Sequence, residues 1–276
     1  MEHLEAIADY IETIKSTHDL TSLIVEGQPG WGKTHTVSTA LASTNTEKIG
    51  LSSYSTPLNL YNFIAEHPTD VIVLDDCSGL FNDQNAMAIL KAATWPDTDN
   101  KRRVSWGSTS GKAVIPEFEF HGKLIIICNS FPKTADGEAV KSRGLAIKVE
   151  FSVEKAKTLL LTAAKDPTWF HNTKVSLNVA EFLIKNLTET TISKISYRTL
   201  KAGYHLAEVH PNKWQELFTL ILPKEIIGPA DIVRKLANDA IQVKEQIRIF
   251  IEKTGLSERK FYNLRSDLGL SRTATN

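Results

Sequence analysis

The chain contains 276 residues, and its 32 basic side chains balance its 32 acidic ones, so the formal net charge is zero. A balanced charge excludes attraction to nucleic acid through the overall field, so any nucleic-acid surface must be a local patch. The length suffices for two or three domains. No apolar run approaches the ~20 residues that span a bilayer, and the acidic start of the chain lacks the features of a signal peptide. The two cysteines, Cys77 and Cys128, predict reduced thiols rather than a disulfide framework, and hence a cytoplasmic protein.

Short apolar segments rich in β-branched residues alternate with helical periodicity through residues 1–152. The predicted strands are Leu23–Val25, Ile49–Ser52, Val71–Leu74, Leu124–Ile127 and Ala146–Val149. Continuous apolar runs of this kind indicate strands that are covered on both faces, and therefore an α/β core with a parallel sheet. Helices are predicted over Leu4–Ile14, Thr36–Ala42, Leu58–Ala65 and Ala86–Ala93.

A glycine-rich sequence, Gly27-Gln28-Pro29-Gly30-Trp31-Gly32-Lys33-Thr34, follows the first of these strands. Its spacing, between a strand and a helix, is that of a phosphate-binding loop. Glycines let backbone N–H groups converge on phosphate oxygens at a helix N-terminus. Lys33 is expected to reach the β- and γ-phosphates, and Thr34 to bind Mg²⁺. We therefore predict that Gly27 through His35 bind a nucleoside triphosphate.

Two later strands end in polar side chains. Asp75 and Asp76 follow Val71–Leu74, and Asn129 follows Leu124–Ile127 and one cysteine. Asp75 is expected to hold Mg²⁺, and Asp76 to orient or deprotonate the attacking water. If the two strands are neighbours, Asn129 lies near the γ-phosphate; the alternative is a turn-forming Asn, which is common at strand ends.

In this order the phosphate-binding loop, the Asp-Asp strand, the Asn-ended strand and Lys141-Ser142-Arg143-Gly144 resemble the AAA+ ATPases over residues 1–210. The resemblance implies ATP as the nucleotide and a homo-oligomer, most commonly a hexamer. It also implies that Asn129 is the first sensor and that Arg143 is an arginine finger acting on a neighbouring subunit's nucleotide. Ser196–Leu200 matches the second sensor, with Arg198 near the γ-phosphate, although Ser196 stands where the family often has glycine. For both arginines the alternative is a solvated surface cation.

Asp76 departs from this family, which usually has glutamate there, and the shorter side chain suggests slow turnover. Viral superfamily 3 helicases often have the Asp-Asp pair and an Asn-ended strand, so they are the alternative family. A helical region after the core and Arg198 favour the AAA+ resemblance.

An insertion between the Asp75 and Asn129 strands predicts a hairpin, because two β-favouring arms flank a Gly/Ser-rich tip. The AAA+ clade of branch-migration and replicative helicases carries a hairpin just before the first sensor. Arg102, Arg103 and Lys112 are then candidates to contact a phosphate backbone. An ordinary surface hairpin is an equally open interpretation.

The remaining sequence is predicted to be helical. Residues 153–227 resemble the α-helical lid of the AAA+ family, and Gly228-Pro229 marks a boundary before a small domain at residues 228–276. There a helix, the break Thr254-Gly255-Leu256 and a second helix capped by Ser257 predict a helix-turn-helix, with or without a wing. Candidates for DNA contact on its second helix are Arg259, Lys260, Asn263 and Arg265. A structural three-helix cap and a protein-docking domain are the alternatives.

Two hypotheses of function follow. The first is an oligomeric ATPase acting on DNA in strand translocation, branch migration or helicase loading during replication or recombination. The second is a nucleotide-gated switch on DNA that recruits another replication or recombination protein and hydrolyses ATP slowly.

Overall fold

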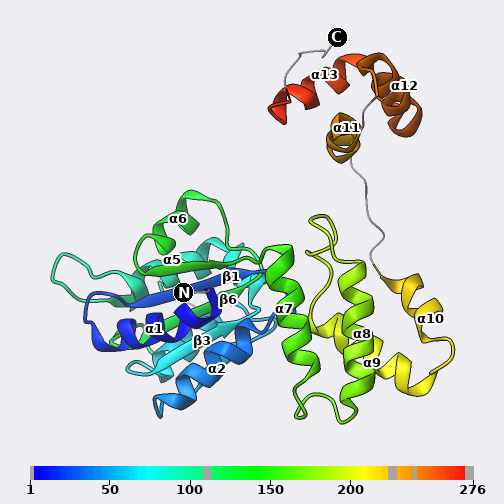
Figure 1. Cartoon of the computed structure of the whole chain (residues 1–276). Helices are drawn as coiled ribbons and strands as arrows, with labels where there is room; N and C mark the ends of the chain where they lie inside the picture. The colour runs from blue at the N-terminus through cyan, green and yellow to red at the C-terminus, as the bar shows by residue number, and fades with distance from the viewer. Residues whose placement is uncertain (1–2, 108–112, 223–228, 239–240, 271–276) are drawn as a thin grey trace. The chain divides into compact units, whose positions relative to one another are not determined.

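A computed structural model describes residues 3–107, 113–222, 229–238 and 241–270 (Figure 1). The contacts divide the chain into two compact units. The first holds the residues up to Lys155 together with Ser196–Thr199, and the second holds Ala156–Ile195 and the residues from Leu200 onward. Within the described ranges no helix is long and apolar enough to cross a membrane.

The first unit is built on a five-stranded sheet of order β2-β3-β6-β1-β7, in which every neighbouring pair is parallel. Each predicted strand is present and extends at most two residues further than expected at either end. The strands are β1 (Ser22–Gly27), β2 (Ile49–Ser52), β3 (Val71–Asp75), β6 (Lys123–Cys128) and β7 (Leu145–Val149). The predicted α/β fold with a parallel sheet is confirmed.

Helices cover both faces of this sheet, which explains the continuous apolar character of its strands. Alternate residues of β3 illustrate this: Ile72 and Leu74 belong to one buried cluster, and Val73 belongs to the other. The helices packed on the Val73 face are α1 (His3–Ser16) and α2 (Lys33–Ser43). Those on the opposite face are α3 (Pro57–Glu66), α4 (Ser78–Phe81), α5 (Gln84–Thr94) and α6 (Ala135–Lys141).

The sheet topology places the predicted site residues at one edge. Strand β1 pairs with β6, and β6 pairs with β3. Because the strands are parallel, their carboxyl ends lie side by side, with Glu26 opposite Cys128 and Asp75 opposite Ile127. The segments that leave β1, β3 and β6 at this carboxyl edge are the phosphate-binding loop, the Asp-Asp pair and Asn129.

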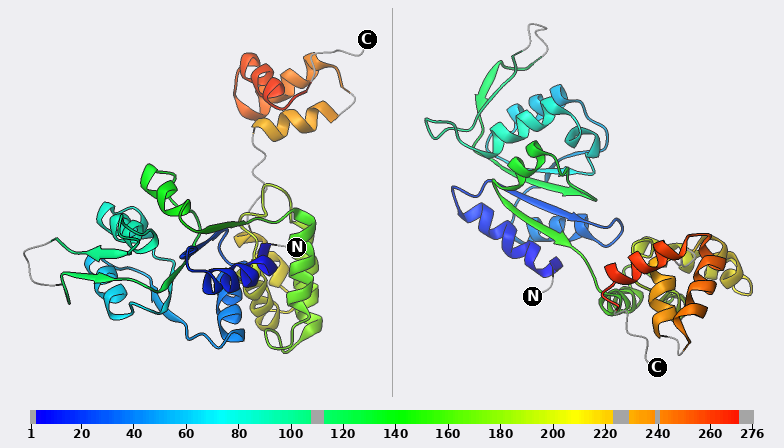
Figure 2. Two further views of the ribbon diagram at one scale, coloured as in Figure 1. Left: turned by 90° about the vertical axis from the view of Figure 1, so that its left-hand side faces the viewer. Right: turned by 90° about the horizontal axis from the view of Figure 1, so that it is seen from above.

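The predicted hairpin is present as β4 (Arg103–Ser105) and β5 (Glu117–Glu119), which are antiparallel with Val104 opposite Phe118. Its strands extend away from the main sheet (Figure 2). Val104 and Phe120 are fully buried in the α5 side of the core, so the base of the hairpin is part of the hydrophobic core. The tip, with Lys112, lies outside the described residues.

The second unit is helical, as predicted. After α7 (Val153–Ala164) come α8 (Thr173–Lys185), α9 (Tyr197–Val209) and α10 (Trp214–Ile221). Aromatic rings join them: the ring centroids of Phe182 and Trp214 are 5.2 Å apart. Gly203 allows α9 to pack closely, because a Cβ there would lie 2.5 Å from both Phe218 and Val179.

Three further helices complete the chain: α11 (Pro229–Asn238), α12 (Val243–Thr254) and α13 (Glu258–Asp267). They share a small core that includes Val233, Phe250 and Phe261. The turn between α12 and α13 has Gly255 in a left-handed conformation (φ 67°), and the Ser257 hydroxyl accepts a hydrogen bond from Lys260 N. Both features are those expected at a helix end and a helix start. Their assignment as a DNA-binding helix-turn-helix stays a prediction.

Candidate nucleotide-binding site

The phosphate-binding loop makes a tight turn between β1 and α2. Gly30 (φ 81°) and Gly32 (φ 86°) adopt left-handed conformations that disfavour other residues. Helix α2 begins at Lys33, and no side chain caps its N-terminus. The first N–H groups of a helix have no partner inside the helix. This loop and helix therefore present backbone donors and a positive dipole end where an anion can bind. His35 is exposed in the first turn of the same helix.

Lys33 lies within this loop and is buried. Its Nζ donates to the carbonyl oxygens of Gly27 at 2.7 Å and Gln28 at 2.8 Å, and to Asn129 Oδ1 at 3.4 Å. Burial lowers the pKa of Lys33, and the nearby Asp75 carboxylate opposes that shift. The condition set for Asn129 is met, since β6 pairs with β3, and Asn129 lies next to the loop lysine. Its place near a γ-phosphate stays a prediction.

Thr34 and Asp75 form the part of the site that suits a magnesium ion. The Thr34 hydroxyl donates to Asp75 Oδ1 at 3.2 Å. Mg²⁺ prefers oxygen ligands and takes only one or two from protein when phosphate oxygens complete its shell. In the described part of the chain no group of three or more His, Cys, Asp or Glu side chains is placed to hold a metal. The hydroxyl and carboxylate fit an ion that is bound together with a nucleotide.

Asp76 has an unusual backbone conformation. Its N–H donates to Ile127 O at 3.1 Å, which extends the pairing of β3 with β6, and its φ of 57° then turns the chain away from the sheet. Asp tolerates this left-handed region better than most residues. The side chains of Asp76 and Asn129 are both exposed at the carboxyl edge.

The two cysteine thiols, Cys77 and Cys128, are expected to be unreactive. Both are buried and form no disulfide. Burial raises the pKa of the Cys77 thiol to about 11 and that of the Cys128 thiol to about 12. They therefore stay protonated at neutral pH and pack as small apolar groups next to the site.

Arg198 also lies at this site: a Cβ at Gly30 of the loop would lie 3.5 Å from Arg198 Cδ, and Ser196–Thr199 belongs to the same unit as the loop. The backbone N–H of Tyr197 donates to Gly30 O at 3.2 Å. The Arg198 side chain is exposed, and its charge contributes to lowering the pKa of Lys33. The structure therefore brings together the loop, Asp75, Asp76, Asn129 and Arg198 at the carboxyl edge of the sheet.

Arg143 lies elsewhere. It precedes β7, so it is at the amino edge of the sheet, away from its own phosphate-binding loop. Its Nη1 donates to Lys91 O at 3.0 Å, and its guanidinium lies 5.9 Å from the centroid of the Trp95 ring. A finger that acts on another subunit's nucleotide does not need to reach its own loop, so this role stays a prediction.

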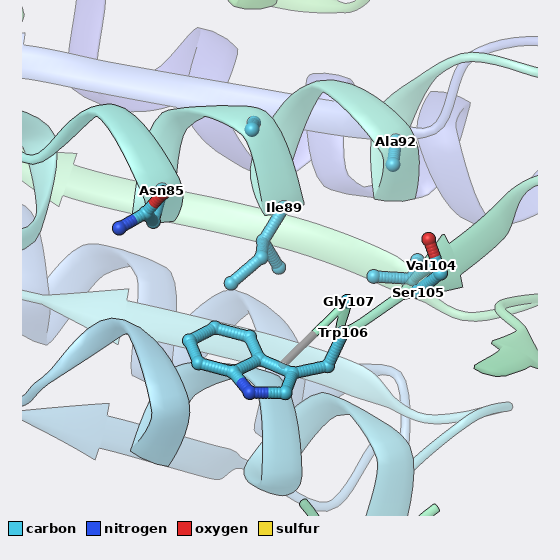
Figure 3. A pocket seen from close by; sticks show the side chains of 8 residues that line it. Asn85, Ile89, Ala92, Val104, Ser105, Trp106 and Gly107 are labelled. Atoms are coloured by element: carbon cyan, nitrogen blue, oxygen red, sulfur yellow. The ribbon is translucent and has the colours of Figure 1, made fainter. Parts of the chain in front are cut away.

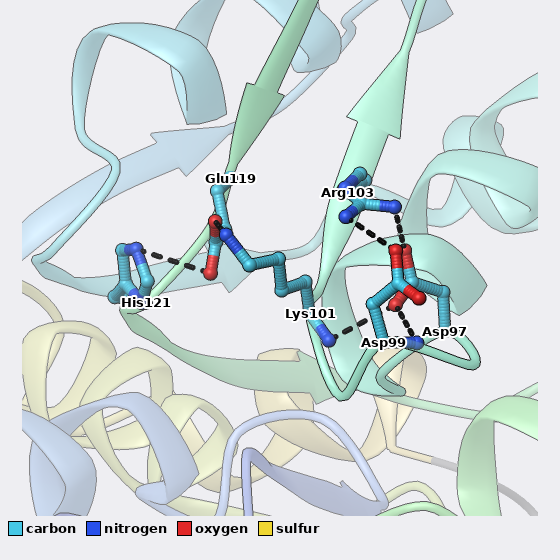
Figure 4. Close-up of polar contacts among 6 residues, drawn as sticks. All are labelled: Asp97, Asp99, Lys101, Arg103, Glu119 and His121. Carbon is cyan, nitrogen blue, oxygen red and sulfur yellow. Dashed lines mark hydrogen bonds and ion pairs between the residues drawn. The ribbon is translucent and has the colours of Figure 1, made fainter.

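The two arginines of the hairpin base are bound within the chain. Arg102 Nη1 donates to Ala93 O at 3.0 Å and to Gly122 O at 2.9 Å, and its guanidinium lies 5.1 Å from the centre of the Phe120 ring. Arg103 donates to Asp97 at 2.8 Å and to Asp99 at 2.7 Å (Figure 4). Both guanidinium groups that the sequence offered for a phosphate backbone are therefore engaged with acceptors of their own chain.

A cavity of ≈ 500 Å³ lies between the hairpin and helix α5, and Trp106 and Ile89 face it (Figure 3). Sequence analysis did not identify it. The helix contributes Asn85, Ala88, Ile89 and Ala92, whose spacing marks one face of a helix, and the hairpin contributes Val104–Gly107.

The DNA candidates on α13 divide into two groups. Arg259, Lys260 and Asn263 are exposed, and two of them line a shallow hollow with Tyr262. Arg265 is half-buried, and its Nη1 donates to Gln246 Oε1 at 2.8 Å, so it ties α13 to α12.

No protein-family model matches this chain. A curated relative, the "Uncharacterized 36.7 kDa protein in nrdC-mobD intergenic region" of Enterobacteria phage T4, is 31% identical over 123 residues. The match covers 40% of this chain and 36% of the phage protein, so the chain spans little more than a third of that relative's length.

Solved structures of RuvB from Thermotoga maritima are similar in fold. One mutant form is 14% identical with a TM-score of 0.51 over 99% of this chain and 91% of its own. A second mutant form is 12% identical with a TM-score of 0.50 over 98% of this chain and 89% of its own. At this identity the similarity concerns the fold: this chain has the α/β fold of the P-loop NTPases, followed by a helical region. RuvB itself is a Holliday junction branch migration motor.

Proposed function

We propose that this protein is an ATPase of the AAA+ type that acts on DNA as a homo-oligomer. The observation that carries the proposal is the contact of Thr34 with Asp75 beside a buried Lys33 that reaches Asn129. These side chains come from three separate segments, and each has the chemistry expected for its place around a triphosphate and its magnesium ion. The RuvB-like fold supports the same proposal.

The chain's own residues would divide the work of hydrolysis. Backbone amides of Gly27–Thr34 and the Lys33 ammonium bind phosphate oxygens, and Thr34 with Asp75 holds Mg²⁺, which neutralises phosphate charge. Asp76 and Asn129 orient the attacking water, and Arg198 stabilises negative charge on the γ-phosphate. Arg143 would act on the site of an adjacent subunit, where a guanidinium is worth several powers of ten in rate in related chemistry.

A DNA motor and a slow nucleotide-gated switch both fit this site. RuvB's activity as a motor favours the first. The switch has one observation in its favour: Asp76, the acid directly after β3, is one methylene shorter than the glutamate usual in AAA+ proteins. In either case the exposed Arg259, Lys260 and Asn263 are the proposed DNA contacts, and a replication or recombination protein is the proposed partner.

The test measures ATP hydrolysis, DNA binding and strand translocation for the wild type and Asp76→Asn. The wild type should hydrolyse ATP with Mg²⁺, and Asp76→Asn should bind ATP but hydrolyse it at least about a hundredfold more slowly. A motor loses translocation in this variant, whereas a switch keeps its ATP-dependent loading. A wild-type protein that binds no adenine or guanine nucleotide with Mg²⁺ contradicts the proposal.

Mixed oligomers test the role of Arg143. Asp76→Asn and Arg143→Ala should each be inactive alone. If Arg143 acts between subunits, mixing the two variants restores part of the activity, because some junctions then combine an intact Asp76 with an intact Arg143. Full activity of Arg143→Ala as a dilute monomer would exclude this role.

A further inference from the structure

An aromatic cluster is packed directly behind the phosphate-binding loop. Trp31 of the loop is only 1% exposed. Its ring centroid lies 5.3 Å from that of Phe151 and 5.2 Å from that of Tyr197, with the Tyr197 ring in an edge-on arrangement. All three residues belong to the first unit. The loop is thus joined by side-chain packing to the residue that precedes Arg198.

The backbone of the loop makes a second set of contacts with the same segment. Gly30 O accepts the N–H of Tyr197 at 3.2 Å. A Cβ at Gly30 would lie 2.5 Å from Ser196 Oγ and 3.5 Å from Arg198 Cδ. Glycine at position 30 is therefore what allows Ser196 to approach, and the aliphatic stem of Arg198 lies next to the loop.

The start of α9 is itself well defined. Ser196 is buried, and its N–H donates to the Thr199 hydroxyl at 3.2 Å, which satisfies one of the donors left open at a helix start. Burial also raises the pKa of the Tyr197 phenol, so the ring stays neutral at physiological pH. A half-buried, neutral ring in edge-on contact with a buried indole fixes the orientation of the helix start better than a fully solvated side chain could.

The Arg198 side chain is exposed, and no hydrogen bond of its guanidinium is found within the described residues. Its position relative to the loop therefore depends on the backbone at the start of α9, which the packing of Tyr197 on Trp31 and the bond from Tyr197 N–H to Gly30 O join to the loop. The Trp31 Nε1 atom is buried and likewise has no partner among the described residues, so the indole contributes through its rings rather than through a hydrogen bond.

We propose that Tyr197, packed on Trp31, is a positioning residue that holds Arg198 at the γ-phosphate side of the loop and so sets the preference for ATP over ADP. The inference rests on the proposed function, because it requires a triphosphate in the loop. Arg198 meets a charge that ATP has and ADP lacks, and a hydrogen bond to a charged group changes affinity by about one to two powers of ten. Tyr197 acts only through Arg198.

The experiment measures the dissociation constants of ATP and ADP with Mg²⁺, using a catalytically silent Asp76→Asn background to prevent turnover. Variants are Tyr197→Leu, Arg198→Ala and the double variant. Tyr204→Leu is the control, since Tyr204 is a buried tyrosine of the same helix α9 whose ring contacts Phe170 instead of the loop. Far-UV circular dichroism and thermal melting check that each variant folds.

Tyr197→Leu should lower the ratio of ADP to ATP dissociation constants by the same factor as Arg198→Ala, about tenfold, and change ADP affinity less than about twofold. The double variant should show no further loss, because both substitutions remove the same interaction. Tyr197→Phe should keep the wild-type ratio, and Tyr204→Leu should keep it as well. If Tyr197→Leu does not fold, Trp31→Phe is the second variant, because a single phenyl ring offers Tyr197 less contact than the indole. It should lower the ratio of ADP to ATP dissociation constants in the same direction.

Three outcomes overturn the inference. One is an unchanged ratio in Tyr197→Leu or Arg198→Ala. Another is an equal loss of ATP and ADP affinity in Tyr197→Leu, which indicates a structural role only. The third is a double variant in which the two effects multiply. If the background protein binds neither nucleotide, the proposed function fails as well, whereas a background protein that prefers ATP while Tyr197→Leu keeps that preference overturns this inference alone.

Discussion

The phosphate-binding loop and the base of the β4–β5 hairpin both contain basic side chains, but these side chains differ in their hydrogen-bond partners. At the hairpin, Arg102 bonds two carbonyl groups and Arg103 bonds two carboxylates. At the loop, Lys33 donates to two carbonyls of the loop itself and weakly to Asn129. The Arg198 guanidinium makes no hydrogen bond within the described residues. The basic side chains of the hairpin are thus committed to acceptors of their own chain, whereas Lys33 and Arg198 are available to bind an anion.

This difference follows from the acceptors that the fold supplies. Neutral carbonyl groups are weaker partners for a cation than phosphate oxygens, so Lys33 gains when an anion replaces them. Arg103 would have to leave two carboxylates to contact a nucleic-acid backbone, and its net charge there is already offset. Availability for an anion is therefore a property of the folded surroundings and not of the motif in which a cation occurs.

The largest effect is expected at the loop. Lys33→Ala should lower ATP hydrolysis at least about a hundredfold, near 3 kcal/mol of transition-state stabilisation, because the loop loses its one ammonium at the phosphates. Lys33→Ala also leaves the Gly27 and Gln28 carbonyl groups without their donor, so it should lower the free energy of unfolding by about 1 kcal/mol, less than its effect on the transition state. Lys48→Ala is the control, because Lys48 is exposed and donates a hydrogen bond to the Ser38 hydroxyl, away from the loop. A Lys33→Ala protein with the wild-type rate would remove the basis of the comparison.

At the hairpin base, substitutions are expected to affect the stability of the fold more than ATP hydrolysis. Arg102→Ala should destabilise the fold by about 2 kcal/mol, because it leaves the Ala93 and Gly122 carbonyls without their donor and removes the contact with Phe120. Arg103→Ala, next to it in sequence but exposed, should leave the unfolding midpoint nearly unchanged. Urea denaturation of the two variants measures this difference. Equal midpoints would show that the carbonyl contacts of Arg102 do not stabilise the base.

A smaller effect is expected from lengthening the side chain of Asp76, the acid that follows β3. If the short side chain limits turnover, Asp76→Glu should increase the hydrolysis rate. The backbone predicts otherwise: φ is 57° at this residue, and glutamate tolerates that region less well than aspartate, so we expect a loss of about 1 kcal/mol in stability and no gain in rate. Asp76→Asn keeps the local preference and should melt like the wild type. A faster, equally stable Asp76→Glu protein contradicts this expectation.

Much of the fold could be predicted because its signals are local. Strand β6, Lys123–Cys128, is a continuous apolar run, and such a run has few alternatives between turn residues. The position of Asn129 followed from the strand order, which places the ends of parallel strands at one edge. For the same reason the contact between Thr34 and Asp75, 41 residues apart in sequence, could be anticipated from two motifs.

Other features of the fold and the site could not be predicted, because they depend on contacts between distant segments that no local sequence pattern indicates. The loop sequence gives no function to Trp31, because the residues that pack against it, Phe151 and Tyr197, come from distant parts of the chain. Arg102 and Arg103 form one basic pair in the sequence, yet one faces carbonyl groups and the other faces carboxylates. No local pattern distinguishes them, because their partners come from other parts of the chain.

The same contrast between committed and available cations recurs on α13 and gives the smallest expected effect. Arg265→Ala removes a bond to Gln246, so it should lower the melting temperature of the C-terminal helices before it affects any ligand. Arg259→Ala should leave melting unchanged, because Arg259 is exposed.

DNA binding separates the two variants further. If α13 contacts the phosphate backbone, Arg259→Ala should weaken DNA binding several-fold at low salt and reduce the slope of log affinity against log salt by about one. At temperatures where the Arg265→Ala protein is folded, its salt slope should equal that of the wild type. A reduced salt slope in Arg265→Ala, or an unchanged salt slope in Arg259→Ala, would show that the exposed side of α13 is not the one that contacts DNA. In that case exposure alone would not be enough to identify the cations that reach the backbone.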